Sequence, residues 1–406
     1  MFKSQTTSFA MLETTHKIKP NDKIKLIFEN IDFSFIEPLV FHKYHRLGRQ
    51  PFHPISMFKA LLLIYLGEAD SVRNLADKLT YNTRLIYLCG FDYNHTPAHN
   101  TFSDFRKRLG ASLFFEILHK IIAQAIAFGI ICGKITAVDS THIIAFSNPF
   151  GKKIEDKRIY SDKDARWGHK NKNFVFFGYK IHLLVDTETD IPIAIEVTPG
   201  NENDGKKLPT LVEQVKRKQP QIKIEKLIAD KAYLDNENYI YLEEEGIEAY
   251  IPHKENRKNP ILTGEVIIDK ENRFYCQKGN QELVYYGYNK KRNRIKLRCP
   301  VGMGKGSCLF FKQCSKSDYG RSFYIGVNKE LKLIGVKEKY DKEFKEIYKK
   351  RSSVERSNSE LKRWHKLNRV FVREIENLNQ HVILSVIAMV IKKIYQFRMR
   401  MCSEYR

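Results

Sequence analysis

The hydrophobic pattern of this chain changes its period near residue 130. Between about residues 21 and 128 apolar residues recur at helical spacing, and Leu75, Ala76 and Leu79 fall on one face of a helix. After Gly133 the apolar segments become rich in β-branched and aromatic residues, which favour strands. We therefore expect a helical N-terminal part followed by a sheet.

The segments after Gly133 predict a succession of strands and helices. Three consecutive strands are expected, at residues 134–144, 176–186 and 191–198. Beyond them we expect a helix at about 203–218, a strand at 226–230, a helix at 236–245 and a strand at 248–252. Three strands followed by alternating helix and strand indicate a mixed sheet, so the expected fold class is α/β.

The rest of the chain contains a polar insertion and a helical end. Residues from about 255 to 335 are basic and show little periodicity, so we expect an insertion packed beside the sheet. Helical periodicity returns from Lys342 through Leu367 and again at about 378–401. The expected domains are a helical part at 1–130, the first part of the sheet domain at 131–254, the insertion at 255–340 and completing helices at 341–406.

The charge balance points to a polyanionic partner. The chain has 70 Lys plus Arg against 47 Asp plus Glu, a net charge of +23. Such a charge attracts nucleic acid, and basic runs recur at residues 216–218 and 290–292. The alternative is a generically basic protein, but the clustering of the charges favours nucleic acid.

The helical part admits two interpretations. Asp22, Ser56 and Ser71 stand where helix N-caps would be wanted, and basic residues follow one another at residues 106–108. Short helices with exposed basic residues fit a helix-turn-helix DNA reader, and they fit any small helical bundle as well. Both interpretations stay open at this point.

The sequence predicts a cytoplasmic protein without a membrane partner. The N-terminal residues lack the apolar core of a signal peptide, and the longest apolar run, 382–391, is too short to span a bilayer. Cytosolic disulfides are rare, so the seven cysteines are expected to be reduced or metal-bound rather than paired.

Two aspartates each end the apolar part of a predicted strand. Asp139 ends the apolar residues 135–138, and Asp230 ends residues 227–229. Ligands of α/β proteins lie at the carboxyl ends of strands, so the pair is a candidate site. An aspartate after a strand is by itself usually a turn residue, which is the competing interpretation.

A third acid, Glu355, lies in the first C-terminal helical segment. The spacing places it on one helix face together with Tyr348, Arg351 and Lys362. The competing interpretation is a solvated helix in which Arg351 and Glu355 form an ordinary ion pair.

The spacing of these four residues carries a family resemblance. The pattern Y-x2-R-x3-E-x6-K resembles the YREK signature of bacterial insertion-sequence DDE transposases. Other segments resemble the family's strand motifs, in the family's order: residues 138–141, 178–180, 198–201 with Asp204, and 228–233. Residues 48–51, 56–62 and 100–106 resemble the helical domain that precedes these cores. Ala232 departs from the pattern, in which glycine is common.

The resemblance implies a fold and a site. It implies an RNase H-like mixed sheet with a helical N-terminal domain and a cysteine-bearing insertion. Asp139, Asp230 and Glu355 would be the catalytic acids and would hold two Mg2+ ions, for which Mn2+ can substitute. Tyr348, Arg351 and Lys362 would grip DNA phosphates.

The resemblance also implies an activity. Metal-dependent cleavage of transposon ends would be followed by strand transfer into target DNA, by cut-and-paste and through hairpin ends. The expected partners are double-stranded DNA, at both the transposon ends and the target, and a second copy of the chain. Two alternatives are a transposase-derived DNA-binding protein that no longer cuts and a DNA endonuclease without strand transfer. The three intact acids argue against the first alternative.

The insertion contains a candidate zinc site. Cys276, Cys299, Cys308 and Cys314 are enough for a tetrahedral structural zinc, and a segment with so little apolar content would gain from metal-coupled folding. The spacing lacks a C-x2-C pair, so reduced surface thiols are the alternative. Related transposases carry cysteines in the corresponding insertion, which favours zinc.

Overall fold

A computed structural model describes residues 2–3, 5, 8–45, 48, 50–154, 157–171, 174–252, 261–269, 273–289, 292, 294–326, 342–368 and 370–404. The chain divides into two compact units: the first comprises Met1–Ile224 and Ser352–Arg406, and the second Glu225–Arg351. Arg49, from the segment 48–51, and Lys290 and Lys291, from the basic run 290–292, lie outside the described residues. Parts of the insertion lie outside them as well.

The first unit begins with helices, of which those after residue 21 were expected and α1, before them, was not. These are α1 (Phe9–Lys17), α2 (Lys23–Glu29), α3 (Ile36–Val40), the 3-10 turn η1 (Phe41–Lys43), α4 (Pro54–Tyr65), α5 (Val72–Tyr81), α6 (Thr83–Cys89) and α7 (His99–Ala127). The predicted caps Asp22 and Ser71 are confirmed, because their side chains accept from the N–H groups of Lys25 and Asn74. The Ser56 cap is wrong: Pro54 starts α4 two residues earlier, and the Ser56 hydroxyl donates to Gly90 O instead.

Helix α7 is the one described helix that is long and apolar enough to cross a bilayer. Half of its most apolar window is nevertheless buried in the protein, where it packs on α14 (Ile375–Glu404). Gly110, with φ 67°, breaks α7 into two parts. The apolar run at 382–391 lies within α14 and is buried throughout.

The sheet of the first unit is antiparallel. Its long strands are β1 (Ile135–Ile144), β5 (Phe174–Asp186) and β6 (Ile191–Pro199), which confirms the three predicted strands. Strand β5 lies between β1 and β6, with Asp139 opposite Leu183 in the β1–β5 register. Three short strands that follow β1 and precede β5 along the chain were not predicted. Strands β2 (Lys152–Ile154) and β3 (Lys157–Ile159) form a hairpin, and β4 (Arg166–Asn171) pairs with β5.

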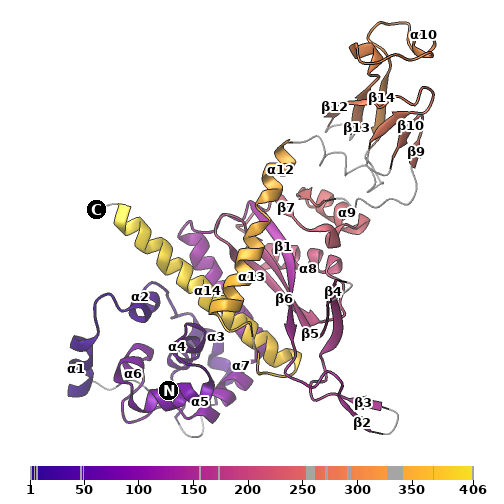
Figure 1. Ribbon diagram of the computed structural model, residues 1–406. Coiled ribbons are helices and arrows are strands. Elements are labelled where there is room, and N and C mark those ends of the chain that lie inside the picture. The colour runs from indigo at the N-terminus through magenta and orange to yellow at the C-terminus, as the bar shows by residue number, and fades with distance from the viewer. Residues whose placement is uncertain are drawn as a thin grey trace. The chain divides into compact units, whose positions relative to one another are not determined.

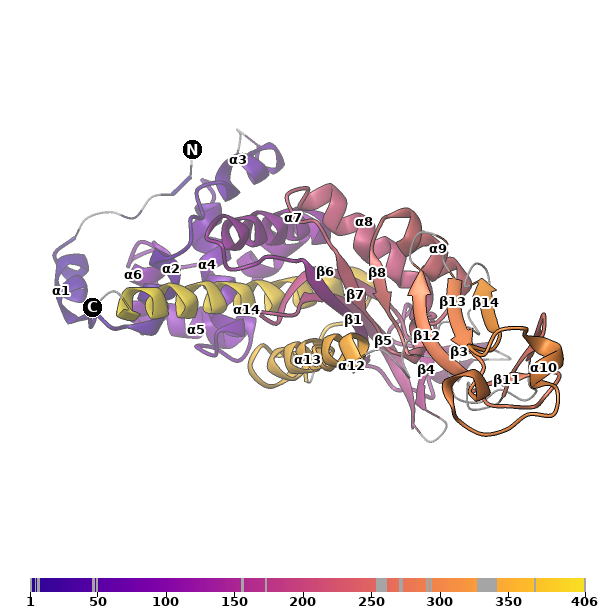
Figure 2. The same ribbon diagram turned by 90° about the horizontal axis from the view of Figure 1, so that it is seen from above.

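Helices cover this sheet (Figure 1 and Figure 2). Helix α8 (Leu208–Lys218), which follows the 3-10 turn η2 (Gly205–Lys207), packs along β6, where the Gln214 amide bonds both N–H and C=O of Ile195. Those bonds satisfy backbone groups at the outer edge of β6. Helix α13 (Ser352–Trp364) packs on β1, β5 and β6, and α14 packs on β6 and on α13.

The second unit contains a β-α-β element and a small β module. Strands β7 (Lys226–Ile228) and β8 (Glu248–Tyr250) are parallel and are connected through η3 (Lys231–Tyr233) and α9 (Asn236–Glu244). The antiparallel β1-β5-β6 strands and this parallel pair have the succession expected for an RNase H-like core. The expected fold class, mixed α/β with N-terminal helices, is confirmed.

The insertion is more ordered than the sequence predicts. It forms two three-stranded antiparallel sheets, one of β9 (Ile261–Thr263), β10 (Val266–Ile268) and β11 (Phe274–Cys276), the other of β12 (Val284–Asn289), β13 (Arg294–Arg298) and β14 (Ser322–Gly326). Between the last two strands lie η4 (Val301–Met303) and α10 (Phe311–Cys314). The module has its own core: Val266, Ile268, Phe274, Leu283, Ile295, Leu297, Phe323 and Ile325 are buried together. Strands this short hide the period of two by which a sheet is recognised in a sequence.

The predicted continuous helix from Lys342 to Leu367 is wrong. The structure has two helices, α12 (Lys342–Lys349) and α13, separated by a turn at Lys350 and Arg351. The N–H groups of these two residues bond three positions back, to Ile347 and Tyr348, which tightens the end of α12. Two consecutive serines, Ser352 and Ser353, then begin α13. Serine is common at the start of a helix and less favourable in its interior, because its hydroxyl competes for backbone hydrogen bonds.

Candidate active site

The expected position of Asp139 at the end of a strand is wrong: Asp139 lies near the middle of β1, because pairing with β5 continues to Ile144. The preceding residues Ala137 and Val138 are fully buried, whereas Asp139 is half-buried. The Asp139 carboxylate accepts a 2.8 Å hydrogen bond from the N–H of Ser140. Because side chains alternate along a strand, Asp139 and Ser140 face opposite sides of the sheet. The Asp139 carboxylate therefore lies on the opposite face of the sheet from Ser140, at a position that is partly accessible to solvent.

A polar network lies on the Ser140 side of the sheet. The Ser140 hydroxyl donates to Asp204 at 2.8 Å, and the Lys180 ammonium donates to the other oxygen of Asp204, also at 2.8 Å. Lys180 further donates to the backbone oxygen of Glu202 at 2.9 Å. Three sequence motifs named above, at 138–141, 178–180 and 198–204, therefore meet directly behind Asp139. Sequence reasoning named these motifs but assigned Asp204 no role.

His182 is buried within the same layer. Its Nε2 lies 2.9 Å from the Thr198 hydroxyl, and burial, with Lys180 and Lys207 nearby, lowers the pKa of His182 to about 4. The histidine is therefore neutral at pH 7 and acts as a polar partner of Thr198 within the sheet.

Glu355 lies in the first turn of α13, the helix that packs on β1. Its side chain is exposed, while Ser353, Val354 and Ser357 on the same helix are buried. The next residue, Arg356, donates to both carboxylate oxygens of Asp190 at 2.8 and 2.7 Å. The first unit thus brings the Asp139 strand and the Glu355 helix into contact and ties down the turn that carries Glu355.

A second ionic cluster anchors α13 to α14. Glu360 lies 3.4 Å from the Lys393 ammonium and 3.5 Å from that of Lys392, and 3.8 Å from His365. Burial raises the pKa of Glu360, but the neighbouring His365 and the two lysines outweigh it and hold this pKa at about 2. The carboxylate is therefore charged at neutral pH and fixes the helix pair.

Lys362 lies seven residues after Glu355 and so shares its face of α13. The Lys362 side chain is half-buried. Trp364, at the end of α13, is 65% exposed and has the Lys392 ammonium 6.0 Å from its ring. The geometry agrees with an interface residue rather than a core residue.

Asp230 belongs to the second unit, directly after β7. It caps the 3-10 turn η3, because its carboxylate accepts a 2.7 Å bond from the Ala232 N–H. This placement is the strand-end position expected from the sequence. Tyr233, the residue after Ala232, is fully buried. The alanine at 232, where glycine is common in the family, is therefore compatible with both the Asp230 cap and the buried Tyr233.

Tyr348 and Arg351 also belong to the second unit. The Tyr348 ring stacks on Phe344 at 5.9 Å, and Phe344 lies 5.4 Å from the Tyr250 ring. Arg351 is in the turn that follows α12. The expected face shared by all four residues of the Y-R-E-K pattern is thus divided between two helices and a turn, and only Glu355 and Lys362 are on one helix.

The acids fit Mg2+ by their chemistry, since carboxylate oxygens are the ligands that hard divalent cations prefer. Asp139 and Glu355 are carried by elements that pack together, and Asp230 lies in the second unit. Within the part of the chain that the structure describes, no group of three His, Cys, Asp or Glu side chains is gathered closely enough to hold a metal ion.

The cysteines of the insertion are half-buried free thiols. Among the described residues, these thiols form no group of three or more that could hold a metal ion. Cys276 packs against the module's hydrophobic core. The insertion has more apolar packing than its sequence suggests, because eight buried apolar residues form that core.

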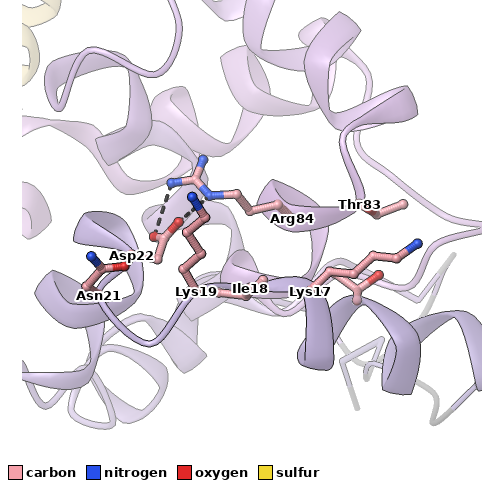
Figure 3. A pocket seen from close by; sticks show the side chains of 8 residues that line it. Lys17, Ile18, Lys19, Asn21, Asp22, Thr83 and Arg84 are labelled. Atoms are coloured by element: carbon pink, nitrogen blue, oxygen red, sulfur yellow. Dashed lines mark hydrogen bonds and ion pairs between the residues drawn. The ribbon is translucent and has the colours of Figure 1, made fainter.

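A cavity of about 400 Å³ lies among the N-terminal helices (Figure 3) and is lined by Lys17, Lys19, Asp22 and Arg84, among others. The Arg84 guanidinium donates to Asp22 at 2.6 Å and also to Glu68 at 3.1 Å. Lys17 pairs with Glu13 at 2.6 Å. Because Arg84 and Lys17 are paired with acids, the cavity has the character of a structural clasp where α1, the start of α2 and α6 meet.

The family of the chain follows from its sequence as well as its fold. The family model described as "Transposase DDE domain" matches residues 131–391, more than half of the chain, and a second, "Transposase domain (DUF772)", matches residues 12–108. The chain therefore belongs to the DDE-domain transposase family, and the resemblance is confirmed. No curated protein sequence matches the chain.

Solved transposase structures are distantly similar. A piggyBac transposase synaptic complex with hairpin DNA is 10% identical, with 98% of this chain and 78% of that chain covered and a TM-score of 0.35. A Mos1 transposase paired-end complex is 14% identical, with a TM-score of 0.20 and 51% of this chain covered. This chain spans 61% of that Mos1 chain's length. At such TM-scores the likenesses support no further conclusion.

Proposed function

We propose that this protein is a transposase that cleaves DNA at the ends of a mobile element and joins them to target DNA. One observation carries the proposal: in a chain of the DDE-domain family, the helix that bears Glu355 packs on the strand that bears Asp139. Asp230, which caps the turn after β7, would be the third acid of the site.

Asp139, Asp230 and Glu355 would hold two Mg2+ ions, and Mn2+ can take their place. When bound, such ions supply positive charge to the attacking and leaving oxygens of a phosphodiester. The chain's own contribution is to fix the carboxylates. The Ser140 N–H orients Asp139, the Ala232 N–H orients Asp230, and the Arg356 clasp holds the turn of Glu355.

Tyr348, Arg351 and Lys362 would hold the DNA strand. A guanidinium binds phosphate in a fork and an ammonium binds it as a point charge, so Arg351 and Lys362 suit two neighbouring phosphates. The stack of Tyr348 on Phe344 fixes the phenol, whose hydroxyl can donate to a further phosphate oxygen.

The partners follow from the charge and from the reaction. A net charge of +23 favours double-stranded DNA, and the helical N-terminal domain would read it. Two element ends must be cut together, so a homodimer on DNA is the working assembly. We place the protein in the cytoplasm, where it meets bacterial DNA.

The route we propose is cut-and-paste through hairpin ends. Water attacks first and frees a 3′-hydroxyl, and that hydroxyl then attacks the opposite strand, leaving a hairpin. A second hydrolysis reopens the hairpin, and the 3′-hydroxyl attacks the target. Each step exchanges one phosphodiester or water oxygen for another at phosphorus, so no external energy source is needed.

The test is an end-cleavage assay. Purified protein is incubated with labelled DNA carrying the element's terminal repeats, a target plasmid and Mg2+, and the products are separated on denaturing gels. We expect nicked ends, hairpins and joined products, all lost on chelation. Hydrolysis without joining would identify an endonuclease, and binding without cleavage a DNA-binding descendant; either result refutes the transposase proposal.

The zinc site at Cys276, Cys299, Cys308 and Cys314 stays a separate prediction. Metal analysis of protein purified without chelator tests it. One zinc per chain would support the site. Absence of zinc would reject it and would mean that the hydrophobic core stabilises the module without a metal.

A further inference from the structure

A second cavity in the first unit has the chemistry of a nucleotide site. It has a volume of about 420 Å³, within the range of small-molecule sites, and lies where β3 and β4 meet β5. Its lining consists of Arg158, Ile159, Tyr160, Lys163, Ala165, Arg166, Trp167 and Phe177. Three of these residues are cationic, three are aromatic, and none is acidic.

The aromatic residues form a fixed platform. Phe177 is 4% exposed, and its ring lies 4.8 Å from the Tyr160 ring, stacked at 29°. The Trp167 ring lies 5.6 Å from Phe177 and is 40% exposed. Large exposed aromatic side chains supported by a buried ring offer a flat apolar surface at which a further ring can stack.

The acids next to the cavity are used elsewhere. Asp162 is fully buried and accepts from the Tyr179 hydroxyl at 2.6 Å and from the Glu374 N–H at 3.2 Å. Asp164 accepts from the Ile375 N–H at 2.9 Å, at the start of α14. Both carboxylates therefore hold the loop onto α14, and neither is paired with a cation of the cavity lining.

The loop itself is held by Arg166. Its guanidinium donates to the backbone oxygens of Lys163 at 2.7 Å and Ala165 at 2.8 Å. The Arg166 guanidinium thus shapes the cavity wall, and its own position is set before a ligand arrives.

The adjacent hairpin continues the positive surface. Strands β2 and β3 project beyond the sheet (Figure 1), and Lys153 lies directly opposite Arg158 in their register. Both side chains are exposed, and Lys152 is exposed beside them. Like charges directly opposite each other on two strands are destabilising, and an anion lying across the pair would remove the repulsion.

We propose that this hairpin and cavity bind a single-stranded segment of DNA, with phosphates along Lys153, Arg158 and Lys163 and one unpaired base on the Tyr160 and Trp167 rings. The inference rests on the proposed function only in taking DNA as the ligand. An unpaired strand is required because bases in a duplex stack on each other and offer no free face to a protein ring. Such stacking is tolerant of sequence, so the site would not select a base.

The two tryptophans of the chain, Trp167 and Trp364, make a direct test available. In the W364F protein, Trp167 is the only tryptophan, and its fluorescence reports on the cavity. We expect a short oligothymidylate to quench it and a blunt duplex to leave it unchanged. The matched W167F protein, which keeps only the exposed Trp364, should show no comparable quenching.

Two further variants separate stacking from charge. W167A should weaken binding of the single strand about 5- to 150-fold, the range that one stacked base contributes. The surface variant R158A/K163A should weaken binding and reduce the slope of log affinity against log salt by roughly 1.4, since each phosphate contact to a single strand adds about 0.7.

The outcomes are distinguishable from a failure of the proposed function. No quenching in W364F, or equal quenching by the blunt duplex, would overturn the single-strand site. End cleavage by the same W364F protein is measured in parallel. Retained cleavage without quenching rejects this site alone, whereas quenching without cleavage supports the site and rejects the transposase proposal.

Discussion

Arg356 and Asp190 are joined by a two-pronged ion pair between α13 and the turn that connects β5 to β6. The guanidinium Nε and Nη2 atoms donate to the two carboxylate oxygens at 2.8 and 2.7 Å, and Nη1 donates to the Ser352 hydroxyl at 2.7 Å. Glu355 is the neighbour of Arg356 in the chain. The pair therefore fixes the first turn of α13, from which the candidate catalytic glutamate extends.

The Arg356 clasp predicts a positioning effect. Asp190 has a φ of 58°, which asparagine tolerates, so Asp190→Asn removes the charge without straining the backbone. We expect the end-cleavage rate to fall about three- to tenfold because the pair is partly exposed, with little change in DNA affinity. Glu13→Ala, which removes an exposed pair on α1, is the matched control and should leave the rate unchanged. Equal rates in wild type and Asp190→Asn would show that the clasp does not position Glu355.

The network behind β1 predicts a loss of stability. Asp204 and Lys180 are 21% and 13% exposed in their side chains, and Asp204 also receives the Ser140 hydroxyl. Asp204→Ala leaves the lysine charge poorly compensated, so we expect the free energy of unfolding to fall by about 2–4 kcal/mol. Urea unfolding followed by circular dichroism measures it. A loss no larger than that caused by Glu13→Ala, which removes an exposed pair, would contradict the structural role.

The core of the insertion predicts a separate stability effect. Phe274 is fully buried in the β module, so Phe274→Ala should destabilise the second unit by about 3–5 kcal/mol. Limited proteolysis should then cut the module faster than the N-terminal helices. If proteolysis of the module is unchanged, its apolar core does not hold it together.

Two histidines, the buried His182 and the half-buried His381, predict loss of stability in acid. Burial lowers the pKa of His182 and of His381 to about 4, from 6.5. Between pH 6.5 and 4 the unfolded chain binds protons that the folded chain does not, so stability falls as pH falls through this window, by up to about 3 kcal/mol for each histidine. Thermal unfolding at pH 7, 5.5 and 4.5 measures the slope, and His381→Gln should make it shallower. A slope that His381→Gln leaves unchanged would argue against a neutral His381 in the folded chain.

Much of the core was predictable because its segments are long and periodic. Strands β1, β5 and β6 are each nine residues or longer, and helix α5 buries Leu75 and Leu79 as its spacing indicates. Asp139, Asp230 and Glu355 could be named from the sequence because two follow short runs of apolar residues and the third lies in a spaced pattern. Their joint role as metal ligands stays a prediction.

Other features depend on contacts that a sequence does not reveal. The pairing of Asp190 with Arg356 joins residues 166 positions apart, and Gln214 bonds the outer edge of β6 through its side chain. The break between α12 and α13 depends on hydrogen bonds from the N–H groups of Lys350 and Arg351 to the carbonyl groups three residues earlier. The sequence does not reveal this break, because the spacing of charged residues through 350 and 351 is still that of a helix. The short strands β2 to β4 lacked a visible period, yet they form the proposed single-strand site.

The most direct measurement replaces each acid in turn and follows end cleavage and DNA affinity together. Asp139→Asn, Asp230→Asn and Glu355→Gln keep the shape of each side chain and remove its charge. We predict that each variant loses cleavage of labelled terminal DNA in Mg2+ by at least about a thousandfold and binds that DNA within about threefold of wild type. Wild-type cleavage by any one of the three variants would contradict the shared carboxylate site.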